Sequence, residues 1–297
     1  GKLISKGGGV FPRTAKTIPL SAEMKALLEI GKNEATPSEI MNAILRIKAD
    51  LLFFGGIGTY VKSERESHVE VSDRANDAIR INGDELRAKV VGEGANLGMT
   101  QRGRIEAALA GVRLNTDAID NSAGVDCSDH EVNIKILLNT QVTAGKLTMA
   151  ARNKLLADMT DEVAQLVLRD NYQQSQTISM LQQRGQQLID AQQRMMKLLE
   201  REGLLNREIE FLPSDEEILE RVKAGVGLTR PELAVLLPYG KMWLFDKLLD
   251  SDLPDDPLTE EDLFNYFPTP LRKKYAAGIE KHKLRREIVA TVITNSF

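Results

Sequence analysis

In the first half of the chain, short apolar runs alternate with helical patterns. The runs at 50–54, 88–91 and 112–116 each end at a loop of glycine, small or polar residues. Such runs are typical of buried strands in a parallel sheet. Apolar stripes at 105–109 and 132–137 predict helices in the same region. The pattern therefore predicts an α/β fold, a partial Rossmann-like parallel sheet with flanking helices.

In the second half, strand patterns stop and long helical patterns with short polar breaks follow. We therefore expect an α/β domain over 1–146 and an all-α helical domain over 147–297. The glutamine-rich stretch at 170–193 keeps an apolar periodicity, which indicates a solvated helix face rather than a disordered tract. An a/d stripe follows; it is too short for a coiled coil and favours an antiparallel helical hairpin. The stripe consists of Leu181, Leu188, Ala191, Met195 and Leu198.

Helix starts are marked by a hydroxyl residue three positions before an acid. The segment Thr36–Glu39 is a capping box with Pro37 at the first helical position, where a missing N–H costs nothing. Pro238 is expected to kink or end the helix that begins near Arg230. Three further starts are Ser214 with Glu217, Thr229 with Glu232 and Thr259 with Asp262.

The loop after the first strand is rich in glycine. Because ligands bind beyond the carboxyl ends of strands in an open α/β sheet, this loop is a candidate site. It contains Gly56 and Gly58, but Val61 stands where a GxGxxG fingerprint has its third glycine. Two interpretations are open: a tight turn that needs positive φ, or a glycine pair, Gly55 and Gly56, that lets a flat ligand approach the backbone.

The loops after the second and third strands each offer a side-chain amide. Gly94 precedes Asn96 in the second loop, and Asn121 lies in the third. An amide among small residues can hold a ribose or a carboxamide, although the same pattern also occurs in simple turns. Ser128 lies where a helix is expected to begin. It is either an N-cap with Glu131 as its box partner or a ligand for a substrate carboxylate at the helix N-terminus, and the two roles are compatible.

Composition narrows the classes of function. Of the 297 residues, 42% are hydrophobic, and 39 basic residues stand against 43 acidic ones, so the chain lacks the positive excess that nucleic acid or anionic membranes favour. Apolar stretches are too short and too broken to span a bilayer. One cysteine, Cys127, excludes an internal disulfide and fits a reducing, cytoplasmic setting. The histidines His68, His130 and His282 have no zinc-ligand spacing, so no metal site is predicted.

The ends of the chain suggest that it belongs to something longer. It opens without methionine, has no secretory signal pattern, and closes inside the helix-like run IVATVITNSF. We therefore expect a fragment of a larger protein.

Several segments together resemble a known family. The order DLLFFGG, KVVGEGAN and NTDAIDNSAGVDCSDHE resembles the second half of the nucleotide-binding domain of glutamate dehydrogenases. The sequence of these segments is most similar to that of the very large NAD-specific glutamate dehydrogenases, with which the chain shares ISKGGGVFPR, DLLFFGGIGTYVK, RAKVVGEGANLG and GLTRPELAVLLPYGK. These motifs spread over residues 4–241, which is most of the chain.

The resemblance implies a reaction and roles for individual residues. It implies oxidation of L-glutamate to 2-oxoglutarate and ammonia with NAD, by a full-length enzyme that is a homo-oligomer. Asn96 would lie beside the nicotinamide ribose, Asn121 near nicotinamide and substrate, and Gly55 and Gly56 beneath the adenosine side, while Ser128 would bind the side-chain carboxylate of the substrate. Gly94 belongs to the same cofactor loop.

Two features depart from the family pattern. Gly55 and Gly56 replace an Ala-Ala pair of the small enzymes, and Ser122 and Ala123 replace Ala-Gly. In addition, the glycine-rich dinucleotide loop and the catalytic lysine and aspartate have no match here, and the resemblance places them upstream of residue 1. No catalytic residue is therefore assigned within the chain, which is expected to be inactive alone. The alternative hypothesis is a non-catalytic α/β and helical module used for assembly or regulation.

Overall fold

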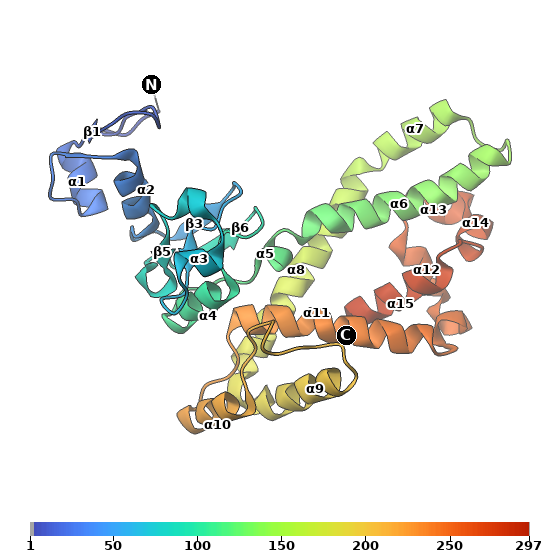
Figure 1. Ribbon diagram of the computed structural model, residues 1–297. Coiled ribbons are helices and arrows are strands. Elements are labelled where there is room, and N and C mark those ends of the chain that lie inside the picture. Colours follow the sequence, from blue (N-terminus) through green and yellow to red (C-terminus); the bar gives the residue numbers. More distant parts are fainter. Residues whose placement is uncertain (1–2, 297) are drawn as a thin grey trace. The chain divides into compact units, whose positions relative to one another are not determined.

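The computed structural model describes residues 3–296 and contains two compact units (Figure 1). The first, called here the α/β unit, comprises Gly1–Asn121 together with Ile209–Leu212 and Leu228–Ala234. The second, the helical unit, comprises the remaining residues: Ser122–Glu208, Pro213–Gly227 and Val235–Phe297.

Parallel strands form the centre of the α/β unit. Strand β3 (Leu51–Phe54) pairs in parallel with β6 (Val90–Glu93), with Leu51 opposite Val90. The predicted third strand, 112–116, is reduced to a single parallel bridge between Val90 and Arg113. The other strands are two residues long: β1 (Ile18–Pro19) and β2 (Glu34–Ala35) pair antiparallel, and β4 (Val61–Lys62) and β5 (Ile81–Asn82) pair in parallel.

The two faces of the β3 and β6 pair differ in burial. Phe54 and Val91 are almost fully buried in the core of the unit, whereas Leu51, Phe53 and Val90 on the other face are exposed. Alternation with period two explains this split, because successive side chains of a strand point to opposite faces. The core beneath the pair consists of Leu45, Phe54, Val61, Ile81, Leu86, Ala88, Val91, Met99, Ala107, Val112 and Leu114.

Short helices surround these strands, and the capping box is confirmed. The hydroxyl of Thr36 accepts from the N–H of Glu39 at 3.2 Å, and the Glu39 carboxylate accepts from the N–H of Thr36 at 2.8 Å. The helices are α1 (Ala22–Leu28), α2 (Pro37–Leu45), α3 (His68–Val71), α4 (Gln101–Leu109) and α5 (Asp117–Asp120), with 3₁₀ turns at Arg74–Asn76 and Gly83–Glu85.

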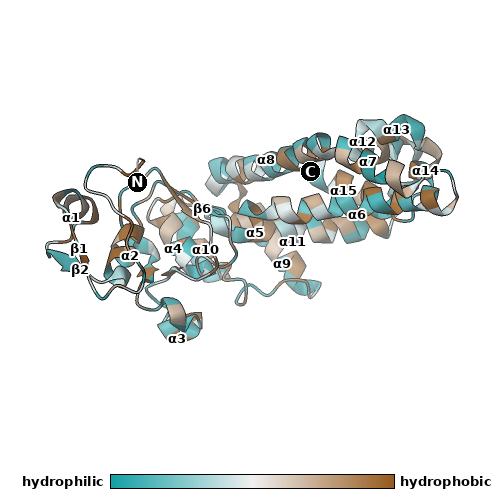
Figure 2. Ribbon diagram, turned by 90° about the horizontal axis from the view of Figure 1, so that it is seen from above, coloured by the Kyte–Doolittle hydropathy of each residue, from teal (hydrophilic) through white to brown (hydrophobic). Residues whose placement is uncertain are grey.

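In the helical unit, α6 and α8 lie side by side, and α12 packs on α15 (Figure 1). Hydrophilic and hydrophobic residues alternate along α6, as expected of a helix with one buried face (Figure 2). The helices are α6 (Ser122–Thr143), α7 (Met149–Asp158), α8 (Thr160–Arg184), α9 (Ile189–Arg201), α10 (Asp215–Ala224), α12 (Glu260–Tyr266), α13 (Thr269–Lys274), α14 (Ala276–Glu280) and α15 (Arg285–Ser296), together with the part of α11 (Arg230–Leu249) that follows Ala234. Further 3₁₀ turns cover Gly185–Leu188, Leu253–Asp255 and Pro257–Thr259.

None of the helices within residues 3–296 is both long and apolar enough to cross a membrane.

The core of the helical unit is formed mainly by residues far apart in the sequence. The core consists of Ile134, Leu137, Leu138, Met159, Leu263, Tyr266, Phe267, Leu271, Tyr275, Ile279, Ile288 and Val289.

The helix starts predicted from the sequence have different outcomes. Ser214 caps α10 with Glu217 in a complete capping box. The N–H and hydroxyl of Thr229 donate to the Glu232 carboxylate just before α11, but Thr259 makes no cap bond with its side chain. Helix α11 continues through Pro238 to Leu249, so of the two expected effects of the proline, a kink or an end of the helix, the end is wrong.

The a/d stripe lies one position away from the residues that are buried. Gly185, with φ of 39°, ends α8, and a 3₁₀ turn separates α8 from α9. This break changes the helical phase, because a 3₁₀ turn has three residues per turn rather than 3.6. The buried residues are consequently Ile189, Gln192, Met196 and Leu199.

Candidate functional site

The loops after β3 and β6 meet at one edge of the parallel pair. The N–H of Ala95 donates to the carbonyl of Phe54 at 3.0 Å, which joins the loop after β6 to the last residue of β3. Because the strands are parallel, Gly55 and Gly56 of one loop and Asn96 of the other follow carboxyl ends at the same edge. The structure thus brings together the first two loops that the sequence analysis selected.

Gly55 and Gly56 are exposed, and neither has a positive φ. The conformation that requires glycine belongs to Gly58, whose φ is 144° and whose added Cβ would lie 2.7 Å from the Tyr60 hydroxyl. A Cβ at Gly56 would meet no atom within 4 Å. The turn interpretation therefore applies to Gly58, and nothing in the backbone of this unit requires glycine at 55 or 56.

Gly94 has a packing reason for being glycine. A Cβ at this position would lie 2.3 Å from Cζ of Phe53 and 3.0 Å from its Cε1. No real side chain fits at that distance without a shift of the Phe53 ring. Gly94 thus lets the second loop pass directly over the aromatic ring of the neighbouring strand.

Asn96 and Asn121, which were selected separately, contact each other. The Nδ2 group of Asn121 donates to Oδ1 of Asn96 at 3.0 Å, and both side chains are exposed. Asn121 is the C-terminal cap residue of α5. This bond uses one donor and one acceptor, so an amide N–H₂ on Asn96 and an amide carbonyl on Asn121 are still available to a ligand.

A buried ion pair stabilises the end of β6, from which the loop with Gly94 and Asn96 begins. Arg104 of α4 binds Glu93, the last residue of β6, through two hydrogen bonds of 2.7 and 2.9 Å. Burial raises the pKa of Glu93, and the Arg104 guanidinium acts in the opposite direction. Asp117 accepts from the N–H of Leu97 at 2.7 Å, and Asp120 accepts from the N–H of Glu93 at 3.0 Å. Helix α5 therefore holds the backbone on both sides of Asn96.

Ser128 does not begin a helix, which corrects the N-cap interpretation. Helix α6 starts at Ser122, so Ser128 lies in its second turn, exposed, with its hydroxyl donating to the Gly124 carbonyl at 3.1 Å. Its expected box partner, Glu131, pairs with Lys135 instead. Because Ser128 is not at the helix N-terminus, the helix dipole and free N–H groups cannot help it to bind a substrate carboxylate. Ser128 can offer a substrate only its exposed hydroxyl.

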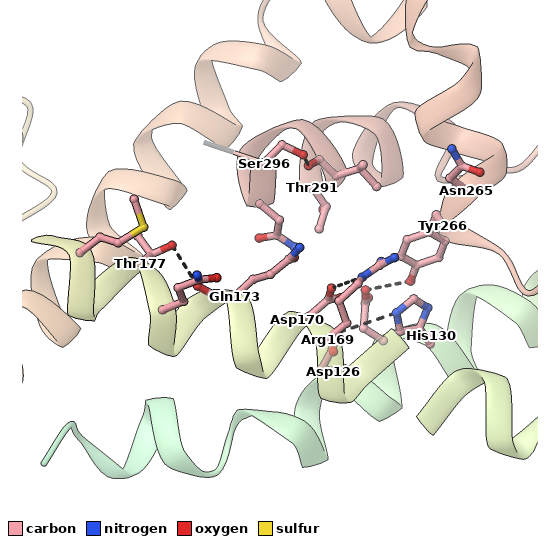
Figure 3. Close-up of a pocket in the computed structure, with 15 residues that line it drawn as sticks. Asp126, His130, Arg169, Asp170, Gln173, Thr177, Asn265, Tyr266, Thr291 and Ser296 are labelled. Atoms are coloured by element: carbon pink, nitrogen blue, oxygen red, sulfur yellow. Dashed lines mark hydrogen bonds and ion pairs between the residues drawn. The ribbon is translucent and has the colours of Figure 1, made fainter. Parts of the chain in front are cut away.

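A group of titratable residues that the sequence analysis did not select lies in the helical unit. One ring nitrogen of His130 and one carboxylate oxygen each from Asp126 and Asp170 lie within 4.8 Å of one another. Figure 3 shows these side chains together in a cavity between α6 and α8. Spacing i, i+4 relates Asp126 to His130 in the sequence, but Asp170 is on another helix, which sequence spacing does not reveal.

Burial perturbs these groups. Desolvation, together with the charges of Asp170 and Asp129, raises the pKa of Asp126 to about 6. Desolvation also lowers the pKa of His130, whose ring stacks on Tyr266 with centroids 4.5 Å apart. At neutral pH the cavity therefore holds carboxylates beside an uncharged imidazole.

Comparison with known proteins identifies the family. Residues 1–181 match the model of the bacterial NAD-glutamate dehydrogenase catalytic domain, and residues 225–297 match the glutamate dehydrogenase C-terminal model. The chain belongs to the bacterial NAD-glutamate dehydrogenase family. The resemblance found in the sequence is thereby confirmed, and the alternative of a non-catalytic module is not favoured.

Individual relatives agree with this family. The chain is 52% identical over 294 residues to the NAD-specific glutamate dehydrogenase of Halomonas elongata, 53% identical over 294 residues to that of Pseudomonas aeruginosa, and 50% identical over 299 residues to that of Mycobacterium tuberculosis. Each comparison covers 99% of this chain but 18% of the relative, so the chain spans less than a fifth of the length of these proteins.

Proposed function

We propose that the protein, at full length, is an NAD-dependent glutamate dehydrogenase that converts L-glutamate to 2-oxoglutarate and ammonia. Membership of the family and the names of the three relatives support this activity. When bound, NAD accepts the hydride that leaves the substrate. In this proposal the described chain supplies part of the cofactor site and one substrate contact, and other groups come from the rest of the protein.

The hydrogen bond between Asn96 and Asn121 is the observation that carries the cofactor assignment. It holds two exposed amides at 3.0 Å and leaves a donor and an acceptor for a carboxamide or ribose. The backbone on both sides of Asn96 is fixed by Asp120 and Asp117, which accept from the N–H groups of Glu93 and Leu97, so the amide needs little reorganisation when a ligand binds.

The glycines fit a flat ligand at the same edge. Gly55 and Gly56 are exposed and have no conformational need to be glycine, so access for a ligand is the remaining reason for their small size. Together with Gly94, Asn96 and Asn121, they are the residues that we assign to NAD. Ser128, through its exposed hydroxyl, is assigned to the side-chain carboxylate of glutamate.

The wider organisation is part of the same proposal. The α/β strands would belong to a Rossmann-like sheet that other parts of the protein complete, with a functional division between 1–146 and 147–297. The single cysteine, Cys127, is free and exposed, in keeping with a cytoplasmic enzyme. The full-length enzyme would be a homo-oligomer.

Glutamate-dependent formation of NADH by the purified full-length enzyme tests the proposal. Asn121→Ala should lower kcat/KM for NAD, whereas Asn33→Ala should not, because Asn33 is also an exposed amide, and its side chain accepts from Lys25 in another part of the α/β unit. Absence of NADH formation from the unmodified enzyme would overturn the reaction. Equal kinetics of the two variants would overturn only the assignment of the amide.

A further inference from the structure

A cavity of about 410 Å³ lies among four helices of the helical unit. Helix α6 contributes Asp126 and His130, and α8 contributes Asp170. Residues of α12 and α15 complete the lining, among them Tyr266 and Thr291 (Figure 3).

Two buried polar atoms in this cavity lack a hydrogen-bond partner among residues 3–296. They are Nδ1 of His130 and Oδ2 of Asp126. The His130 residue is only 3% exposed, and its Nε2 lies 4.0 Å from Oδ1 of Asp126, too far for a hydrogen bond. A buried polar atom without a partner destabilises the fold, so a ligand that satisfies such atoms would stabilise it.

The remaining acid of the cavity already has partners. Asp129 accepts from the Tyr266 hydroxyl at 2.9 Å, and Tyr266 accepts in turn from Asn133 at 2.8 Å. Asp129 therefore fixes the aromatic wall on which His130 stacks and is not free to bind an ion.

We infer that Asp126, His130 and Asp170 form a binding site for a divalent transition-metal cation that links α6 to α8. The three ligand atoms lie within 4.8 Å of one another, whereas two ligands of a tetrahedral Zn²⁺ lie roughly 3.4 Å apart. Small side-chain rotations close this difference. One imidazole and two carboxylates suit Zn²⁺ or Mn²⁺, and a fourth position faces the cavity.

Charges around the site favour an added cation. Asp126, Asp129 and Asp170 bring three carboxylates, against the cations Arg169 and Lys241. Arg169 lies 3.4 Å from Asp170, but its side chain is 58% exposed and can turn to solvent. Lys241 is held near the acids in a desolvated position that lowers its pKa, so its ammonium is the internal competitor of the metal.

The proposed site lies on the face of α6 away from Ser128. Residues 126 and 130 are one turn apart, whereas residue 128 is rotated by about 200° from residue 126 on a helix of 3.6 residues per turn. A bound cation would therefore stabilise the helix that carries Ser128 without contacting the substrate.

Titration calorimetry with Zn²⁺ and Mn²⁺ on the untagged full-length protein, stripped with a chelator, tests the inference. We expect one site per chain with Kd below about 100 µM, and a rise in Tm because the metal binds the folded state. Asp126→Asn and Asp170→Asn should each weaken binding roughly tenfold or more. Lys241→Met should leave affinity equal or higher, since it removes the competing charge.

Glu131→Gln is the matched control, because Glu131 is an exposed acid on the same helix that pairs with Lys135. It should bind metal as the parent chain does. Circular dichroism of each variant shows whether its helices are intact, so weak binding by a folded Asp126→Asn variant supports the site. No binding by the parent chain, or equal binding by Asp170→Asn and Glu131→Gln, would overturn it.

Discussion

The side-chain amide of Asn121 donates to that of Asn96 across 3.0 Å, which joins the end of α5 to the loop after β6. These residues are 25 positions apart in the sequence, and each was selected for its own loop. Their contact means that the two amides act as a unit, so a change in one should alter the orientation of the other.

Asn96→Ala in the full-length enzyme should reduce kcat/KM for NAD. The expected loss of transition-state stabilisation is about 1 to 3 kcal/mol, the usual loss when a polar ligand group loses its partner. Stability should change little, because the bond is exposed. A double-mutant cycle with Asn121→Ala should show less damage than the sum of the single variants. Full additivity would mean that the two amides contact the cofactor independently.

Gly56→Ala and Gly94→Ala should have opposite effects on stability. Alanine at 56 meets open space and should leave the free energy of unfolding unchanged or raised by up to about 1 kcal/mol, while NAD binding weakens. Alanine at 94 has to displace the exposed Phe53 ring from its rotamer and should lower the free energy of unfolding by roughly 0.5 to 1.5 kcal/mol. Gly31→Ala is the control, since its Cβ also meets open space but lies outside the candidate loops. Unaltered NAD affinity in Gly56→Ala would remove Gly56 from the site.

Ser128→Ala should be nearly neutral for stability, because Ser128 is exposed within α6 and caps nothing. If its hydroxyl binds the substrate carboxylate, KM for glutamate should rise. Ser128→Asp should raise KM further, because like charges then face each other. Ser179→Ala, which removes a similar exposed hydroxyl bond to the carbonyl of Ser175, should leave both quantities unchanged. Normal glutamate kinetics for Ser128→Asp would exclude a role in substrate binding.

His282 should make the helical unit less stable at acid pH. Its Nε2 bonds the Asn133 carbonyl at 3.1 Å, and its Nδ1 accepts from the N–H of Leu284 at 3.1 Å, so the neutral ring satisfies both bonds. Burial lowers its pKa from 6.5, with the Asn133 bond and the Glu287 charge acting in the opposite direction. The folded state thus binds fewer protons than the unfolded state, and stability falls as pH decreases below 6.5.

Urea unfolding between pH 7.5 and 5 measures this effect. His282→Leu should lose part of the pH dependence, at most about 1.4 kcal/mol per pH unit for one proton. Ile279→Val, a buried change without a titrating group, should lower stability by about 0.5 to 1.5 kcal/mol equally at each pH. The role of His282 is refuted if His282→Leu and the parent chain have the same slope.

The 297-residue chain alone should form no NADH from glutamate and NAD. Hydride transfer needs cofactor and substrate held together by groups from a complete site, and we propose that this chain supplies only part of that site. The full-length enzyme, assayed under the same conditions, is the positive control. Activity of the isolated chain above a blank without glutamate would contradict this expectation.

The sequence predicted which elements exist better than it predicted which residues they bury. The run at 50–54 and the box at Thr36 depend on local chemistry, and both are found in the structure. On α6, however, Val132 is 51% exposed while Ile134 and Leu138 are buried. Packing against helices that are distant in the sequence determines which face of α6 is buried. Local patterns therefore fix a helix but not its rotation.

The candidate sites show the same limit. Asn96 and Asn121 were found because each follows a strand in its own loop. The group of Asp126, His130 and Asp170 was missed, since Asp170 approaches only after α8 packs beside α6. The N-cap reading of Ser128 was wrong because α6 begins six residues earlier, where no hydroxyl and acid pair marks its start.

The α/β unit is completed by residues that the ribosome adds late. Arg230 bonds Asn115 at 3.1 and 2.8 Å, Gln101 donates to the Pro231 carbonyl at 3.1 Å, and Arg102 lies over the Phe211 ring. At about 5 to 20 residues per second, roughly 6 to 23 s separate synthesis of residue 121 from that of residue 234. During this interval the nascent α/β unit lacks the segments Ile209–Leu212 and Leu228–Ala234, and a chain that ends after residue 121 would never contain them.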